Sequence, residues 1–437
     1  MNTPETLMYE LSADFARSCD EQDPLASFRE EFLFPEHHGE KVVYMTGNSL
    51  GLQPKQTKDY IEQELDDWEK HGVEGHFRAK HPWYSYHEIL TPKIGKIVGG
   101  LDHEVVVTHS LTTNLHLLMI SFYRPTAERF KIICEHKAFP SDQYALESQA
   151  QLHGLDPKEA IIEVAPRDGE HHIRHEDIVQ TIREHGESVA LVMFGGVNYY
   201  IGQKFDMADI TKEAHAVGAI CGFDLAHAAG NVELKLHDWG VDFAAWCSYK
   251  YLNSSPGGVS GMFIHERHGN NPNTFRLAGW WGHDKDERFK MEPGFKPIPG
   301  AEGWQLSNAP VLSMAAHNAA LDIFMEAGFD RLLEKSRKLT GYLEFCIEAL
   351  TKESEGLPIE IITPKDPSMR GCQLSMLITQ KGRAVFEHLE KNGVIADWRE
   401  PDVIRLAPVP LYNSFNDMYR FTEILREAMK ENGLWNG

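Results

Sequence analysis

The chain has 437 residues, of which 42% are hydrophobic and 25% are charged, and its formal net charge at pH 7 is −22. This composition is typical of a globular protein, and the length supports roughly two domains. The strong negative charge argues against a nucleic acid or an anionic membrane as partner, although it leaves room for a local positive site for an anionic ligand.

Cysteine usage and the N-terminal composition indicate a reducing compartment. None of the six cysteines forms a C-x-x-C pair, and four of them lie in apolar runs typical of strands, so we expect reduced thiols in the core. The acidic stretch 1–31 has no basic segment followed by an apolar one, and no apolar run is long enough to span a bilayer. We therefore predict a cytoplasmic protein without a signal peptide.

The N-terminal part of the sequence predicts a helix within the first forty residues that ends near Pro35. A short apolar run follows at 41–45, and the Gly-rich stretch 46–51 is typical of a turn. Residues 56–70 have the periodicity of a helix.

From about residue 104 onward, short apolar runs alternate with helix-like segments. The runs are 105–107, 130–134, 161–164, 189–194, 219–223 and 243–247. Strands that alternate with helices predict an α/β fold in which a parallel sheet is covered by helices on both faces.

The pattern changes after Pro310. Residues 311–350 form a long helical stretch with a break expected at Gly328. Apolar strand-like runs and two further helical segments follow, which predicts a smaller α+β domain. We expect three parts: an N-terminal segment, 1–45, that packs with the small domain; a large domain, 46–310; and the small domain, 311–437.

Two turns between a predicted strand and a predicted helix carry hydroxyl groups. One is the stretch 110–113, Ser-Leu-Thr-Thr, and the other is 139–142, Phe-Pro-Ser-Asp. Hydroxyls and free amides at a helix N-terminus form an anion site, and Phe139 is suited to stack on a planar ligand. Each turn by itself is better explained as an ordinary helix cap.

Asp224 and Lys250 each follow a predicted buried strand, and those two strands are consecutive in the sequence. Adjacent parallel strands end at the same edge of a sheet, where ligands of α/β proteins bind. A Schiff base between Lys250 and pyridoxal phosphate, with Asp224 facing the pyridine nitrogen, explains both residues. Taken singly, Lys250 reads as an ordinary strand-end lysine and Asp224 as the partner of His227. The adjacent histidine pairs 37–38 and 171–172 do not have metal-ligand spacing, so we expect no metal.

The motif at 247–253, CSYKYLN, resembles the cofactor-lysine motif of the kynureninase family. Further matching motifs span nearly the whole length. They are TGNSLGLQPK at 46–55, FPSD at 139–142, GWWGH at 279–283, SNAP at 307–310, RGCQL at 370–374 and LAPVPLYNSF at 406–415.

This resemblance implies a fold-type-I pyridoxal-phosphate enzyme: a large domain with a mostly parallel sheet of the seven-stranded type between helices, and a smaller α+β domain. It also implies a homodimer, with the active site at the interface, that hydrolyses L-kynurenine or 3-hydroxy-L-kynurenine to an anthranilate and L-alanine. Such enzymes serve tryptophan catabolism and NAD biosynthesis. The sequence does not indicate which of the two substrates is preferred.

The resemblance also assigns roles to particular residues. Lys250 is the Schiff-base lysine, Asp224 pairs with the ring nitrogen, and His227 and Phe139 flank the ring, with Asp142 in the same turn as Phe139. The rest of the cofactor cradle comprises Leu111, Thr112, Tyr249, Trp280 and Asn308, the last reaching across the dimer interface. The substrate pocket comprises Ser49, His76, Trp281, Asn308 and Arg405, of which Arg405 grips the substrate carboxylate.

Two positions depart from the family pattern: Gly195 stands where many relatives carry serine, and Ile201 where they carry threonine. A hydroxyl ligand of the cofactor is therefore missing at Gly195. Tyr200 is retained, and two roles for it are equally compatible with the pattern: proton transfer during carbon–carbon cleavage, or a hydrogen bond to the phosphate.

Two other functions compete with this interpretation. A cysteine desulfurase requires a mobile nucleophilic cysteine in an exposed loop, which neither Cys346 nor Cys372 matches. A regulatory cofactor-binding protein without catalysis has no need for Arg405 and Tyr200.

Overall fold

The computed structural model describes residues 9–436, which form two compact units. The larger unit contains residues 53–199 and 203–326. The smaller unit contains the described residues up to Leu52, the short segment Tyr200–Gly202, and the chain from Ala327 onward. The predicted domain limits, 45/46 and 310/311, differ from this division, in which residues 46–52 belong to the smaller unit and residues 311–326 to the larger.

The larger unit is built around a seven-stranded sheet with the strand order β6-β12-β11-β10-β9-β7-β8. The strands are β6 Val105–Val107, β7 Lys131–Glu135, β8 Ile161–Val164, β9 Val189–Gly195, β10 Ile220–Asp224, β11 Phe243–Trp246 and β12 Gly261–Ile264. Strands β8, β7, β9, β10 and β11 pair in parallel, whereas β12 is antiparallel to both of its neighbours, β11 and β6. The predicted, mostly parallel α/β sheet is thereby confirmed.

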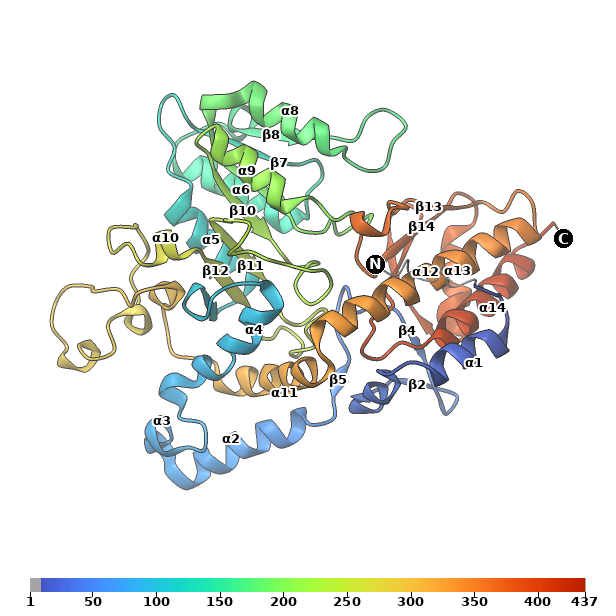
Figure 1. Cartoon of the computed structure of the whole chain (residues 1–437), viewed down its shortest axis with the longest axis horizontal. Helices are drawn as coiled ribbons and strands as arrows, with labels where there is room; N and C mark the ends of the chain where they lie inside the picture. The colour runs from blue at the N-terminus through green and yellow to red at the C-terminus, as the bar shows by residue number, and fades with distance from the viewer. Residues whose placement is uncertain (1–8, 437) are drawn as a thin grey trace, which may run out of the picture. The chain divides into compact units, whose positions relative to one another are not determined.

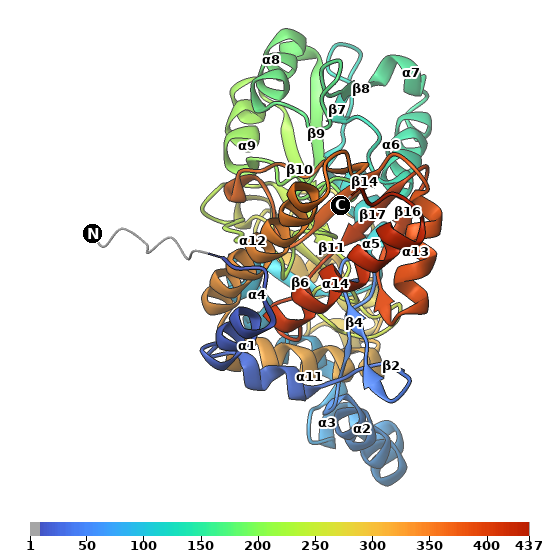
Figure 2. The same cartoon turned by 90° about the vertical axis from the view of Figure 1, so that its right-hand side faces the viewer.

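Helices cover both faces of this sheet. The α-helices of the larger unit are α2 Thr57–His71, α3 Gly75–Arg78, α4 Thr91–Val98, α5 Leu111–Phe122, α6 Pro140–Leu152, α7 Pro157–Ala160, α8 His175–His185, α9 Met207–Ala216, α10 Glu266–Gly269 and α11 Val311–Ala327. Figure 2 shows α8 and α9 on one side of the strands and α6 and α7 on the other. Because both faces are covered, β9 is buried along almost its whole length, which explains its continuous apolar sequence.

The smaller unit contains a four-stranded antiparallel sheet with the order β13-β14-β17-β16. Its strands are β13 Ile359–Ile361, β14 Leu374–Ile378, β16 Asp397–Arg399 and β17 Val403–Leu406, and β4 Val43–Tyr44 pairs with β15 Val394–Ile395 beside it. Its helices are α1 Ala13–Glu21, α12 Phe329–Glu353, α13 Gly382–Lys391 and α14 Phe415–Glu431, of which the last three gather beside β13 and β14 in Figure 1.

Two predictions about helices near the unit limits have different outcomes. The expected break at Gly328 is confirmed, because this glycine has φ +79° and separates α11 from α12. The expected long N-terminal helix is wrong, because α1 ends at Glu21. Pro24 disfavours helical backbone at the residue before it, and a separate 3-10 helix begins only at Ala26.

Membrane helices are not part of this fold as far as it is described. Among residues 9–436, no helix combines the length and the apolar character needed to cross a membrane.

Candidate active site

The carboxyl ends of β10 and β11 bring the predicted lysine and aspartate to one edge of the large sheet. Asp224 is the last residue of β10 and lies opposite Ala245 of β11, and Lys250 follows β11 by four residues. The Lys250 ammonium nitrogen lies 2.9 Å from Nε2 of His227 and 5.8 Å from the centroid of the Phe139 ring. The parallel pairing of β10 and β11 therefore places side by side residues that are 26 positions apart in the sequence.

Two buried carboxyl groups lie together beside Lys250. Asp224 accepts a hydrogen bond from the Ala226 amide at 2.6 Å, and its carboxylate is also hydrogen-bonded to Asp142 in the first turn of α6. Burial raises the pKa of Asp142 well above its usual range, and the Asp224 charge raises it further. Burial also raises the pKa of Asp224, but the Ala226 amide, Asp142 and Lys250 oppose this effect. Asp142 therefore holds a proton for Asp224, which carries the negative charge.

A third buried carboxyl group, Glu135 at the end of β7, was missed in the sequence. It accepts hydrogen bonds from the Gly195 amide at 3.1 Å and from Asn198 Nδ2 at 2.6 Å, and burial raises its pKa to about 7. An ideal Cβ atom added at Gly195 would lie 2.6 Å from Glu135 Oε1. A serine at position 195 would therefore require the Glu135 carboxyl group to move. The signal for Glu135 was an acidic residue at the end of an apolar strand, as for Asp224.

The two predicted anion-binding turns meet through their hydroxyl groups. Thr112 Oγ1, in the first turn of α5, lies 2.8 Å from Ser141 Oγ in the first turn of α6. Ser110, the residue before α5, makes no side-chain cap and instead lies 3.0 Å from Thr113 Oγ1. Two helix N-termini with hydroxyls in contact are suited to an anion, because the positive end of each helix dipole and the free backbone amides both lie at the N-terminus. Leu111 begins α5, and Tyr249 is half-buried directly before Lys250.

Four of the predicted site residues in the large unit, His76, Trp280, Trp281 and Asn308, are exposed or lie in aromatic surroundings. His76 Nδ1 lies 2.9 Å from the Val73 carbonyl oxygen, and the His76 ring packs on Trp83. Trp280 is exposed, Asn308 lies on an exposed loop before α11, and Trp281 is buried against Tyr84.

The remaining predicted residues belong to the smaller unit. Arg405 of β17 is buried and forms a two-pronged ion pair with Asp397, and Ser49 Oγ also donates to Asp397, at 2.5 Å. The Tyr200 hydroxyl donates to the Glu400 carbonyl oxygen at 3.3 Å. The structure thus brings Ser49 and Arg405 together around a carboxylate that the sequence interpretation had not selected. The signal for Asp397 was an acidic residue in a short segment before the Arg405 strand.

The chemistry of the Lys250 group matches the binding needs of pyridoxal phosphate. A buried carboxylate such as Asp224 requires a cationic or strong hydrogen-bond donor, which a pyridinium N–H provides. The amine of Lys250 can form an imine with an aldehyde, Phe139 offers a ring face, and the Thr112 and Ser141 hydroxyls lie at helix N-termini suited to a phosphate. These residues therefore fit the cofactor that the sequence predicted.

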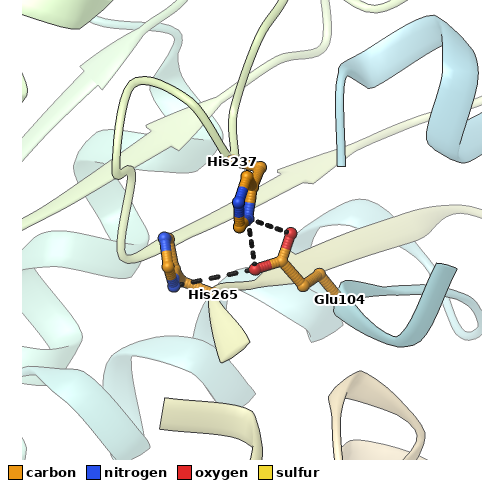
Figure 3. A group of neighbouring side chains, drawn as sticks. All are labelled: Glu104, His237 and His265. Carbon is orange, nitrogen blue, oxygen red and sulfur yellow. Dashed lines mark hydrogen bonds and ion pairs between the residues drawn. The ribbon is translucent and has the colours of Figure 1, made fainter. Parts of the chain in front are cut away.

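A separate group of ionisable side chains in the larger unit is formed by Glu104, His237 and His265. Figure 3 shows the Glu104 carboxylate directed toward both imidazole rings. His237 Nδ1 lies 3.0 and 3.1 Å from its two oxygens, and His265 Nδ1 lies 3.6 Å from one of them. The same oxygens accept hydrogen bonds from the Leu101 and Glu266 amides.

The geometry of this group is that of a structural junction. The His237 and His265 rings stack at an interplanar angle of 19°, so their in-plane lone pairs do not converge on one ion as metal ligands do. Hydrogen bonding to Glu104 raises the pKa of His237, which favours an imidazolium–carboxylate pair. Glu104 thus joins the turn before β6 to the segment that follows β12.

Comparison with known proteins identifies two family models that match the chain. The model described as kynureninase C-terminal domain matches residues 332–425, and the model described as aminotransferase class-V matches residues 43–357. The kynureninase of Flavobacterium psychrophilum is 54% identical over 426 residues, which cover 98% of this chain and 100% of the relative. The kynureninase of Myxococcus xanthus is 52% identical over 432 residues, covering 99% of this chain and 100% of the relative.

Solved structures with a similar fold include a cysteine desulfurase and a cystine C–S lyase. The apo cysteine desulfurase of Thermococcus onnurineus has a TM-score of 0.72 at 16% identity, with 95% of this chain and 98% of that chain covered. The cystine C–S lyase C-DES, in complex with cysteine persulfide, has a TM-score of 0.73 at 15% identity, with 88% and 97% covered. At this low identity the likeness shows a shared fold and carries no information about the substrate.

Neither Cys346 nor Cys372 meets the requirement of a desulfurase for an exposed nucleophile. Cys346 lies in the buried face of α12, and Cys372 is buried beside the start of β14. Burial raises the pKa of Cys346 to about 12, so its thiol is protonated and unreactive at neutral pH.

Proposed function

The chain belongs to the kynureninase family, and from that premise we propose which of its residues bind the substrate and move protons. As a member of this family it is a hydrolase of class EC 3.7.1.3 that uses pyridoxal 5'-phosphate and cleaves L-kynurenine with water into anthranilate and L-alanine, a step of tryptophan catabolism. The observation that carries this function is the 54% identity to a kynureninase over 98% of the chain.

Lys250, Asp224 and Asp142 form the catalytic centre in this proposal. Pyridoxal phosphate supplies an electron sink for the negative charge that develops on the substrate carbons. Lys250 Nζ would hold the cofactor and, once the substrate amine has taken its place, the freed amine would take the proton from the substrate Cα. The Asp224 carboxylate would keep the pyridine nitrogen protonated, and the Asp142 hydrogen bond fixes that carboxylate. Phe139 and His227 flank the ring, and Leu111, Thr112, Tyr249 and Trp280 complete the cradle.

Arg405 binds the substrate α-carboxylate, and Ser49 assists it. This assignment is supported by the burial of the Arg405 guanidinium and by the hydrogen bond that it donates to Ser49 Oγ, at 3.2 Å. A planar guanidinium suits a carboxylate because it donates two parallel hydrogen bonds.

Tyr200 is the proposed proton donor and acceptor at the cleaved carbon. Its carbonyl oxygen accepts a hydrogen bond from Ser375 Oγ at 2.6 Å, and Ser375 stands opposite Arg405 in the β14–β17 pair. The Tyr200 backbone is thus held next to β14, the neighbour of the strand β17 that carries Arg405, and this proximity supports the role.

The active enzyme is a homodimer, in this proposal, whose active site includes residues of both subunits. Support comes from exposed apolar side chains around α3 and the loop near 289: Phe77 is 60% exposed, Phe289 53% and Met291 70%, and the rings of Phe77 and Phe289 contact each other. Such a patch is unusual for a monomer. A second subunit would cover it and would complete the substrate pocket with His76, Trp281 and Asn308.

Sedimentation of the purified protein tests the dimer. We expect a dimeric mass for the wild type and a monomeric, inactive form for Phe77→Glu, with Tyr144→Glu as control, an exposed aromatic residue on α6. A monomeric, fully active wild type would contradict this part of the proposal.

The substrate is tested directly by turnover of the purified enzyme with its cofactor. L-kynurenine, 3-hydroxy-L-kynurenine and L-cysteine are supplied in parallel, and alanine is measured. We expect alanine from kynurenine or its 3-hydroxy form and none from cysteine.

A role in NAD biosynthesis requires cleavage of the 3-hydroxy form. The buried reduced cysteines support a cytoplasmic location.

A further inference from the structure

The carboxylate of Asp397 holds the guanidinium of Arg405 in one plane. Arg405 Nε donates to Asp397 Oδ1 at 3.1 Å, and the second nitrogen, Nη2, lies 2.7 Å from Oδ2. The two residues stand directly opposite each other in the antiparallel β16–β17 pair. Two parallel bonds between a guanidinium and a carboxylate fix the orientation of both groups.

Two more side chains use the same carboxylate. Ser49 Oγ donates to Oδ2 at 2.5 Å, and Arg399 Nε lies 2.9 Å from Oδ1. Three separate segments of the smaller unit, the turn after β4 and the strands β16 and β17, thus meet at Asp397. Both residues proposed to bind the substrate carboxylate, Ser49 and Arg405, depend on it for their orientation.

Burial and charge distinguish the two arginines. The Arg405 side chain is 1% exposed and that of Arg399 is 37% exposed, whereas Asp397 is 13% exposed. Burial acts to raise the pKa of Asp397, but hydrogen bonding and charge from Arg405, with Ser49 and Arg399, lower it, so the carboxylate is ionised at neutral pH. Two guanidinium groups and one carboxylate leave a formal charge of +1.

We propose that Asp397 is a positioning residue that aligns the Arg405 guanidinium for the α-carboxylate of the substrate and holds the Ser49 hydroxyl beside it, and that Arg399 offsets the charge of Asp397 so that the site remains positive. The inference rests on the proposed role of Arg405. A carboxylate beside the substrate carboxylate repels it, and its presence requires a benefit that alignment supplies and a cation that restores attraction.

Replacement of Asp397 distinguishes a positioning role of this residue from a purely electrostatic role. Asp397→Asn removes a negative charge near a negatively charged substrate, so a purely electrostatic role predicts a lower KM for L-kynurenine. A positioning role predicts the opposite, because the guanidinium loses its two-pronged partner and Ser49 loses its acceptor.

The experiment compares steady-state kinetics of the holoenzyme variants with L-kynurenine. For Asp397→Asn we expect KM to rise by about 10- to 100-fold with kcat within about threefold of wild type, as for loss of uniform substrate binding. The visible absorbance of bound cofactor should be unchanged, and Asp397→Glu should recover part of the loss. Glu387→Gln, on exposed α13 of the same unit, is the matched control and should leave KM unchanged.

Arg399→Gln provides a second test that does not depend on the folding of a buried variant. We expect its KM to rise about threefold to tenfold, more at low salt than at high salt, because the affected charge is partly exposed. An unchanged or lower KM in Asp397→Asn would overturn the positioning role, and an unchanged KM in Arg399→Gln would overturn the role of Arg399.

Arg405→Lys separates this failure from a failure of the proposed function. If Arg405→Lys raises KM while Asp397→Asn does not, the carboxylate site stands and only the positioning role is wrong. If Arg405→Lys leaves KM unchanged, the proposed carboxylate site itself is wrong.

Discussion

The ammonium nitrogen of Lys250 lies 2.9 Å from Nε2 of His227, although the two residues are 23 positions apart in the sequence. The hydrogen bond crosses from the turn after β10 to the turn after β11, and it directs the lysine toward the Asp224 side of the sheet edge. Because of this placement, we expect the removal of the Lys250 side chain to have the most specific effect on cofactor attachment and turnover.

Replacement of Lys250 by alanine should abolish steady turnover and the visible absorbance of the lysine-bound cofactor, because the amine that lies beside His227 is lost. Absorbance spectra and alanine release measure both effects. Lys212→Ala, on the exposed surface of α9, should retain normal spectra and turnover. Normal turnover in the Lys250 variant would remove this residue from catalysis.

Replacement of Asp224 by asparagine should lower kcat by about 100-fold and weaken cofactor binding, because the neutral amide no longer keeps the pyridine nitrogen protonated and a buried charge-assisted hydrogen bond is lost. Cofactor titration and kcat measure the two effects separately. Glu176→Gln, at the exposed start of α8, is the control. A wild-type kcat would show that Asp224 acts only in folding.

Replacement of Tyr200 by phenylalanine should slow turnover by about 10²- to 10⁴-fold, the range typical of a lost general acid or base, with cofactor affinity unchanged. A weaker cofactor affinity with normal kcat at saturating cofactor would instead assign the hydroxyl to phosphate binding. Kinetics at several cofactor concentrations distinguish the two roles.

Acid should destabilise the protein through His317, whose ring nitrogens are both buried with no hydrogen-bond partner in the described part of the chain. Burial lowers the pKa of His317 to about 3, whereas an unfolded histidine titrates near 6.5. Below pH 6.5 the unfolded state binds the extra proton, so folding stability falls by up to about 1.4 kcal/mol per pH unit as the pH drops from 6.5 toward 3.

Urea unfolding at fixed protein concentration between pH 7 and pH 4.5 measures this effect. His317→Leu should lose stability less steeply than wild type, by about one proton, whereas His172→Leu, on the partly exposed loop before α8, should retain the wild-type slope. Equal slopes in all three proteins would exclude His317 as a source of acid sensitivity.

The sequence was sufficient to predict contacts between residues at the ends of strands that are consecutive in the chain. Asp224 and Lys250 follow adjacent strands in the chain, so their meeting follows from parallel pairing alone. The Asp397–Arg405 pair depends on the register of β16, a strand of three residues, Asp-Trp-Arg, that is too short and too polar to give a periodic signal. Glu135 was hidden for a related reason, because its partners Gly195 and Asn198 belong to a different strand end.

The single antiparallel strand of the large sheet determines the reach that a ligand must have. Strand β12 lies between β11 and β6 and runs opposite to both, so the ends of β11 and β6 lie at the same edge, two strand spacings apart. That distance is roughly 10 Å. Lys250 follows β11, and the hydroxyl-bearing turn before α5 follows β6. Strand β12 therefore sets the separation between the ends of β11 and β6. The lysine side chain and a small phosphorylated ring together span this distance. One more inserted strand would place the amine and the α5 turn too far apart for a single small cofactor.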